Sequence, residues 1–192
     1  MEFPSTRTID GDAILSPGMP RAVIRYGNQF IYLGDLQYIA RETHHVEEFI
    51  FLCPNSRGHA TQLLLVHFEG FLENKEGSYE FPHQNPLRLY DQDFFYERYF
   101  INLQDDFSRF PGSDLAHAGD YVRQRAYTLA GDMIYQRFQR YVSQDRRYLF
   151  SISYLEANNE PRLTAADLAQ DEHAAQALLE RAKNSFSIEL HD

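Results

Sequence analysis

The sequence predicts an α+β fold with a curved antiparallel sheet of about seven strands and two helices packed on one face. Apolar and polar residues alternate with period two over most of residues 21–72 and again over 148–155, which is typical of strands. The helical period of 3.6 occurs in two later segments. Because strands and helices do not alternate along the chain, the pattern argues against a parallel, doubly wound sheet.

The first strands are expected to form a hairpin. Residues 1–20 contain prolines and glycines with little periodicity, so we expect an irregular N-terminal arm laid over the domain. Alternation begins in residues 21–26 and resumes in residues 29–40. Gly27-Asn28 lies between these segments and favours a tight hairpin turn, because both residues tolerate positive φ.

Two further strands are predicted at residues 47–52 and 61–72, on either side of a turn. In the longer strand the even positions are apolar, and the odd positions combine leucines with His67 and Glu69. A strand that is apolar on both faces is covered on both faces or faces a cavity.

The aromatic residues of 90–100 predict another strand, and a helix follows it. After Gly112 the period changes to 3.6, and Ser113 is the expected N-cap. The helix is expected to end at Gly131, and its apolar stripe consists of Leu115, Ala118, Val122, Ala126 and Leu129.

Residues 133–142 fit either a helix or a strand. The alternation that follows them favours a β-hairpin over residues 133–155, and the helical alternative stays open. Near the end of the chain, Thr164 and Asp167 have the spacing of a capping box. We therefore predict a C-terminal helix over residues 164–187.

Length and composition indicate a single domain over residues 1–192. The formal net charge of −10 disfavours binding to nucleic acid or to an anionic membrane. Cys53 is the only cysteine, so the chain forms no internal disulfide. We see no secretory leader and no apolar segment long enough to span a membrane, and we expect a cytoplasmic protein.

A repeated His-x-Glu pattern is the strongest candidate for chemistry. His45 and Glu47 lie two residues apart, as do His67 and Glu69, so each pair leaves one face of its strand. If paired residues sum to about 114, His45 lies opposite Glu69 and Glu47 lies opposite His67. A slip by two residues brings the two histidines together. Such a cluster suits acid/base chemistry or a transition metal.

The structural alternative for these four residues is a pair of cross-strand ion pairs, each contributing less than ~1 kcal/mol. Because the spacing has little specificity, we favour this alternative and expect no metal and no cofactor.

A second candidate is a local excess of positive charge. Residues 121–147 hold six arginines and two aspartates, and guanidinium groups favour carboxylate or phosphate partners. The candidate anion-binding residues are Arg123, Arg137 and Arg140. We favour the internal alternative, in which the acidic C-terminal helix lies across the basic hairpin.

The chain contains 15 phenylalanines and 13 tyrosines, which suit both pockets and interfaces. It has no dinucleotide fingerprint, phosphate loop or nucleophile elbow. We therefore predict a non-enzymatic module that binds a small apolar or anionic ligand or another protein, with a homodimer as a candidate assembly. The alternative is a metal- or acid/base-dependent enzyme that uses the His-x-Glu residues.

Overall fold

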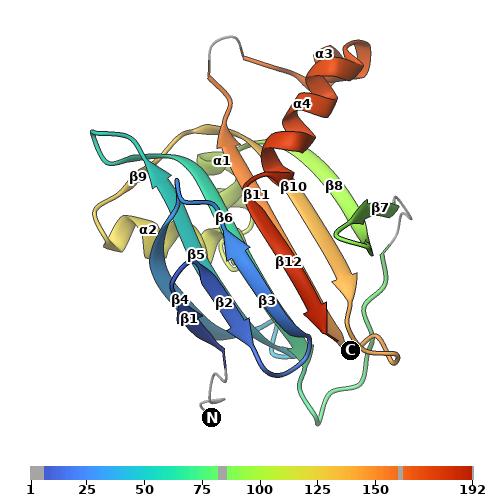
Figure 1. Cartoon of the computed structure of the whole chain (residues 1–192). Coiled ribbons are helices and arrows are strands. Elements are labelled where there is room, and N and C mark those ends of the chain that lie inside the picture. The colour runs from blue at the N-terminus through green and yellow to red at the C-terminus, as the bar shows by residue number, and fades with distance from the viewer. Residues whose placement is uncertain (1–6, 82–85, 160–161, 192) are drawn as a thin grey trace.

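The structure is a computed structural model that describes residues 7–81, 86–159 and 162–191. Two antiparallel sheets lie face to face, and helices cover the outer face of the larger sheet (Figure 1). The predicted α+β class and the antiparallel sheet are confirmed. Among the described residues, no helix is long and apolar enough to cross a membrane.

The large sheet has eight strands in the described part of the chain. Its neighbours are antiparallel, except that the two-residue strand β9 (Thr128–Leu129) runs parallel to β6. The strand order is β4 (Ile31–Ala40), β5 (His44–Pro54), β6 (His59–Phe71), β11 (Tyr148–Ala157), β10 (Asp132–Tyr141), β8 (Gln92–Asn102) and β7 (Pro86–Leu89). The hairpin predicted over residues 133–155 is confirmed as β10–β11, so this segment is a strand and not a helix.

The small sheet joins the two ends of the described chain. Its order is β1 (Thr8–Asp10), β2 (Ala13–Ser16), β3 (Arg21–Tyr26) and β12 (Phe186–His191). The prediction of an irregular arm over residues 1–20 is therefore wrong for the described part, because β1 and β2 are strands. Ala13 and Ile14 are buried, so a short apolar segment here contributes to the core.

Gly27-Asn28 does not form the predicted hairpin. The turn is present, since the Phe30 amide donates to the Gly27 carbonyl at 3.0 Å, but β3 and β4 belong to different sheets. β3 pairs instead with β2 and β12. The alternation on both sides of the turn is real: β3 buries Ala22 and Ile24, whereas β4 lies at the edge of its sheet and has no fully buried residue.

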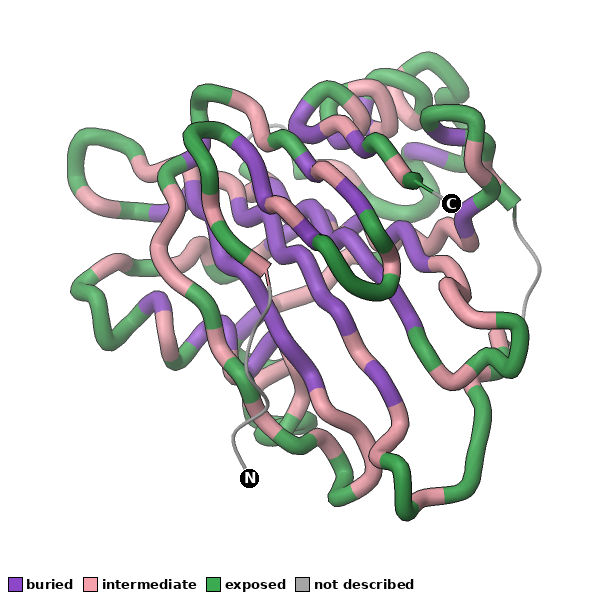
Figure 2. The backbone as a smooth tube through the Cα atoms, turned by 60° about the horizontal axis from the view of Figure 1, so that its bottom comes forward, coloured by how far each residue is buried: buried purple, intermediate pink, exposed green. Residues whose placement is uncertain are grey.

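An aromatic core fills the space between the two sheets. Phe68 of β6 and Phe150 of β11 lie with ring centroids 5.3 Å apart, and Phe49 of β5 meets Phe68 edge-on. Ile24 of β3 and Ile188 of β12 close this core from the small sheet. Figure 2 shows the buried residues concentrated along the middle of the strands.

A second core lies on the opposite face of the large sheet, under α1 (Leu103–Arg109) and α2 (Asp114–Gln124). Leu63 and Leu65 of β6 belong to it, so β6 is covered on both faces as predicted. The predicted helix that starts at Ser113 packs on this face together with α1, whereas the predicted C-terminal helix lies on the other face of the sheet. Ser113 caps α2 as expected, but the helix ends at Gln124 and not at Gly131, because the backbone turns at Ala126 with φ 63° and then continues as β9.

The predicted helix over residues 164–187 is interrupted and shorter. Thr164 and Asp167 form the expected capping box at the start of α3 (Ala165–Gln170). Asp171 has non-helical dihedral angles, and its side chain caps α4 (Glu172–Lys183) by accepting from the Ala174 amide. Phe186 therefore belongs to strand β12 and not to a helical stripe.

Helix α4 packs on the same face of the large sheet as the small sheet does. Leu178 contacts Ile134 of β10 in a small cluster, and the Gln136 side chain donates to the Leu178 carbonyl at 3.0 Å. The ion pair that joins α4 to the hairpin has a basic helix residue and an acidic strand residue, Arg181 and Glu156, 2.7 Å apart. This polarity is the reverse of the predicted docking of an acidic helix on a basic hairpin.

Candidate functional site

The two His-x-Glu pairs lie on opposite faces of the large sheet. In β5 the odd-numbered residues face the small sheet, as Phe49 does, whereas the odd-numbered residues of β6 face the helices, as Leu65 does. His45 and Glu47 therefore lie on the side of the small sheet. The helix face holds His67 and Glu69, so the structure does not bring the four residues into one cluster.

A β-bulge is the physical reason. Beside the turn, Pro54 lies opposite Ala60, which is the predicted register with a sum of 114. The register shifts between Cys53 and Pro54, and from Cys53–Gln62 onward every pair sums to 115. A one-residue shift moves each side chain to the opposite face. The predicted pairs His45–Glu69 and Glu47–His67 are therefore wrong, and His67 lies opposite Glu48.

Glu48, His67 and Ser151 form a buried polar row across β5, β6 and β11. Each is directly opposite the next in the strand register. The His67 Nε2 atom lies 2.9 Å from Glu48 Oε1, and the His67 Nδ1 atom lies 3.3 Å from Ser151 Oγ. The three residues are 0%, 6% and 5% exposed, respectively, so the row is shielded from water.

The polar row is tied to the first residue of α2. The Tyr38 hydroxyl lies 2.9 Å from Asp114 Oδ1 and 3.4 Å from Glu48 Oε2. Tyr38 comes from β4, and Asp114 follows the N-cap Ser113. A chain of polar contacts thus runs from the start of the helix into the middle of the sheet.

The acidic surroundings of His67 favour its protonated form. Burial lowers the pKa of His67, but the adjacent Glu48 carboxylate together with Asp114 and Glu69 outweighs burial, and this pKa is raised to about 9. Burial also raises the pKa of Glu48, an effect that His67 opposes. The pair therefore keeps a proton at neutral pH. A protonated imidazole cannot accept a proton, so His67 is poorly suited to act as a general base.

Glu69 lies two residues further along β6 on the same face. Its carboxylate is 4.0 Å from His44 Nδ1. Burial, reinforced by the negative charge of Asp114, raises the pKa of Glu69 to about 7. In the described residues, no group of three or more His, Cys, Asp or Glu side chains is arranged to hold a metal ion.

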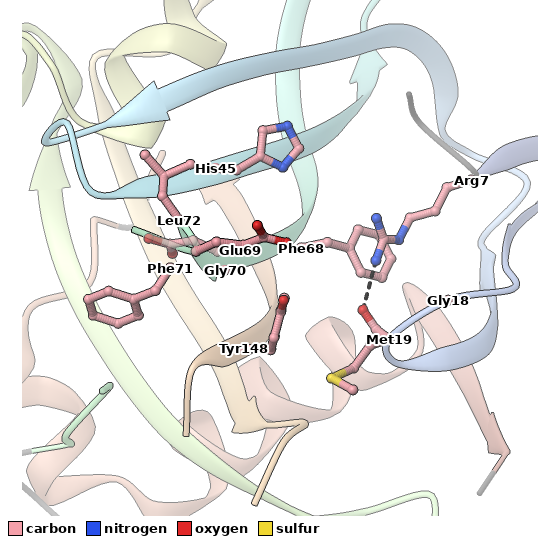
Figure 3. A pocket seen from close by; sticks show the side chains of 11 residues that line it. Arg7, Gly18, Met19, His45, Phe68, Glu69, Gly70, Phe71, Leu72 and Tyr148 are labelled. Carbon is pink, nitrogen blue, oxygen red and sulfur yellow. Dashed lines mark hydrogen bonds between the residues drawn. The ribbon is translucent and has the colours of Figure 1, made fainter. Parts of the chain in front are cut away.

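On the other face, His45 lines a hollow of about 310 Å³ beside Arg7 (Figure 3). Arg7 lies over the Phe68 ring, with its guanidinium carbon 3.8 Å from the ring centroid, and it donates to Glu47 and to the Met19 carbonyl. Arg7 is therefore a close partner of Glu47. These contacts fix Arg7 over the end of the aromatic core.

The three candidate anion-binding arginines are placed apart. Arg123 of α2 pairs with Asp120, and Arg137 of β10 pairs with Glu97. Arg140 projects from the opposite face of β10, where its Nη1 donates to the Gln92 side chain. The three do not form a common site.

Arg140 lines a hollow of about 430 Å³ at the end of the two sheets, with Arg21 and His191 as further basic residues. Arg21 and His191 lie opposite each other across β3 and β12, and both also line a neighbouring hollow. We call this group of lining residues the basic hollow. It consists of Gly18, Met19, Pro20, Arg21, Gln92, Arg140, Val142, Leu190 and His191.

Sequence reasoning missed Glu48, Ser151, Arg21 and His191. The sequence gives no signal for the bulge that selects Glu48, whereas Ser151 could have been found from the alternation of its strand. Arg21 and His191 meet only because the two ends of the described chain pair in one sheet.

Comparisons with known proteins add no relative. The chain matches no protein-family model, no curated protein and no solved structure. The functional argument therefore depends on the residues themselves.

Proposed function

We propose that this protein binds a small anionic ligand, without catalysis, in the basic hollow. The observation that carries the proposal is the composition of the lining: three basic residues and, among the described lining residues, no acidic one. This is unusual in a chain whose net charge is −10. The volume of about 430 Å³ lies in the range of small-molecule sites, roughly 300–1,000 Å³.

The positions of the basic residues support an anion. Arg140 is half-buried, and its Nη1 donates to the Gln92 side chain, which also lines the hollow. Arg21 and His191 stand directly opposite each other at the rim. An anion in the hollow supplies a counter-charge to the arginines and accepts hydrogen bonds from their guanidinium groups.

The proposal is tested by NMR titration with inorganic phosphate and with acetate, each at constant ionic strength. We expect saturable shifts of the Arg140 Nε–H and Gln92 side-chain signals. Arg140→Gln should weaken binding at least about tenfold, because a charge-assisted hydrogen bond is lost. Arg88→Gln is the matched control, since Arg88 is an exposed arginine of β7 that pairs with Asp93 outside the hollow. Equal weakening of binding by both variants would mean that the loss of affinity comes from the change in net charge alone, and this result would contradict the proposal.

The second candidate is an acid/base or metal-dependent enzyme, and the Glu48–His67–Ser151 row favours it. Acid, imidazole and hydroxyl follow one another in the order of a nucleophilic relay. Burial of Ser151 and protonation of His67 make this candidate weaker than the first. Labelling of Ser151 by a fluorophosphonate, absent in Ser151→Ala, would support the enzyme, as would one zinc ion per chain that is lost in His67→Ala. We expect neither result.

A further inference from the structure

We infer that the ligand of the basic hollow is an amphiphilic anion: a carboxylate or phosphate monoester head joined to a short, unbranched apolar tail. This inference rests on the proposed function and adds the class of the ligand to it. The evidence for the inference is that part of the lining of the basic hollow is apolar.

The apolar side of the hollow continues the core between the sheets. Val142, just after β10, and Leu190 of β12 both pack against the aromatic core and also line the hollow. Met19 and Pro20 lie beside them on the loop between β2 and β3. A tail that contacts these side chains is removed from water and extends a core that already exists.

The basic residues of the hollow come from both sheets. Arg140 reaches the hollow from the large sheet, and its guanidinium lies 5.7 Å from the centroid of the Phe94 ring. Arg21 lies at the start of β3, next to Pro20. The head and the tail of one small molecule therefore have separate partners, a cluster of positive charge and an apolar wall.

A ligand that consists of the anionic head alone leaves the apolar side of the hollow without a contact. Met19 is 48% exposed and is among the large apolar residues that the described surface leaves in water. Exposed apolar surface rimmed by polar residues marks binding sites for apolar groups. A bound inorganic anion covers none of it, whereas an alkyl tail covers Met19, Val142 and Leu190 together.

The test is a tail-length series measured by isothermal titration calorimetry. The ligands are acetate, butanoate, hexanoate and octanoate, with ethyl, butyl and hexyl phosphate as the second head, all below the concentrations at which they form micelles. We expect each added methylene to tighten binding about fourfold until the tail fills the hollow. The two series show whether the site takes a carboxylate, a phosphate or both, and each of these results supports the inference.

Two variants locate the tail. Leu190→Ser and Met19→Ser should each flatten the dependence on tail length, and Met19 lies on an exposed loop where substitution leaves the fold intact. Ile39→Ser is the matched control, because Ile39 is an exposed isoleucine of β4 that lines none of these hollows. The same flattening in the control would overturn the assignment.

The outcomes separate the two proposals. Binding of acetate or phosphate with no gain from longer tails overturns the amphiphilic ligand and leaves the anion site standing. Failure of every head to bind overturns both. If hexanol binds as tightly as hexanoate and Arg140→Gln has no effect, the site is apolar and the anion proposal fails.

Discussion

Both faces of the large sheet carry an apolar core, and they differ in the polar groups that are buried beside it. Towards the small sheet, β5, β6 and β11 present mainly aromatic and aliphatic side chains that pack into the aromatic core. Towards α2, the same three strands carry a row of buried polar groups, Glu48, His67 and Ser151. Neighbouring residues such as Phe150 and Ser151 therefore have entirely different energetic roles.

The comparison shows that burial alone does not determine how a residue contributes to the stability of the fold. On the aromatic face, each side chain stabilises the fold through the area it removes from water. On the helix face, removal from water penalises the charges, and only the partner charge and hydrogen bonds offset that penalty. A single truncation should thus have different consequences on the two faces, and a paired substitution should distinguish them.

Phe150→Ala should give the largest loss of stability. Phe150 is fully buried and lies within ring-contact distance of Phe68 and Phe94, so truncation leaves a cavity in the aromatic core. We expect the free energy of unfolding to fall by about 3–5 kcal/mol in urea denaturation. A loss below about 1 kcal/mol would mean that the core is not packed as described.

Glu48→Leu should cost about 3 kcal/mol or somewhat more, because it leaves His67 buried without its counter-charge. The double variant Glu48→Leu/His67→Leu should recover most of this loss, since two apolar residues remove the need for pairing. Chemical denaturation of the wild type, the two single variants and the double variant forms a complete cycle. Additive losses in the cycle would contradict a coupled ion pair.

Stability should decrease as the pH rises, with the smallest effect of the three. The folded pKa of His67 is raised from 6.5 to about 9, so its contribution is complete below pH 6.5 and disappears as the pH rises through 9. The folded pKa of Glu69 is raised from 4.5 to about 7, which lowers stability between these two values. We expect the free energy of unfolding to decrease steadily between pH 5 and pH 9, measured by urea denaturation.

The double variant Glu48→Leu/His67→Leu is the control for this pH dependence. It should lose the decrease above pH 7 and keep the part that belongs to Glu69. An unchanged profile would assign the upper step to another group.

Much of the fold follows from local patterns in the sequence. Alternation and strand-forming residues predict β5, β6, β8 and the β10–β11 hairpin, and the caps at Ser113 and Thr164 start helices as expected. The errors occur where partners are distant. Nothing near Gly27 indicates that β3 pairs with β12, and nothing near Phe186 indicates a strand partner at Tyr26.

The candidate site depends on a finer detail. Residue types and strand periodicity predict a histidine–glutamate pair across β5 and β6, and such a pair is present. One bulge beside Pro54 decides which glutamate pairs with His67, because it places Glu48 opposite this histidine instead of Glu47. The bulge shifts the register by one residue beside the turn, so a count of residues back from the turn gives the wrong partner. A chemical role for the predicted residues stays a prediction.

The pairing of β3 with β12 also has a consequence for the order of folding. The large sheet consists mostly of hairpins, whose loops close within microseconds, whereas β12 must find a partner at the other end of the described chain. Contacts so distant in sequence form slowly. We therefore expect the large sheet to form first, with the face that carries the aromatic core exposed to water until β12 docks. During that interval the chain is most vulnerable to aggregation, and the docking of β12 ends it.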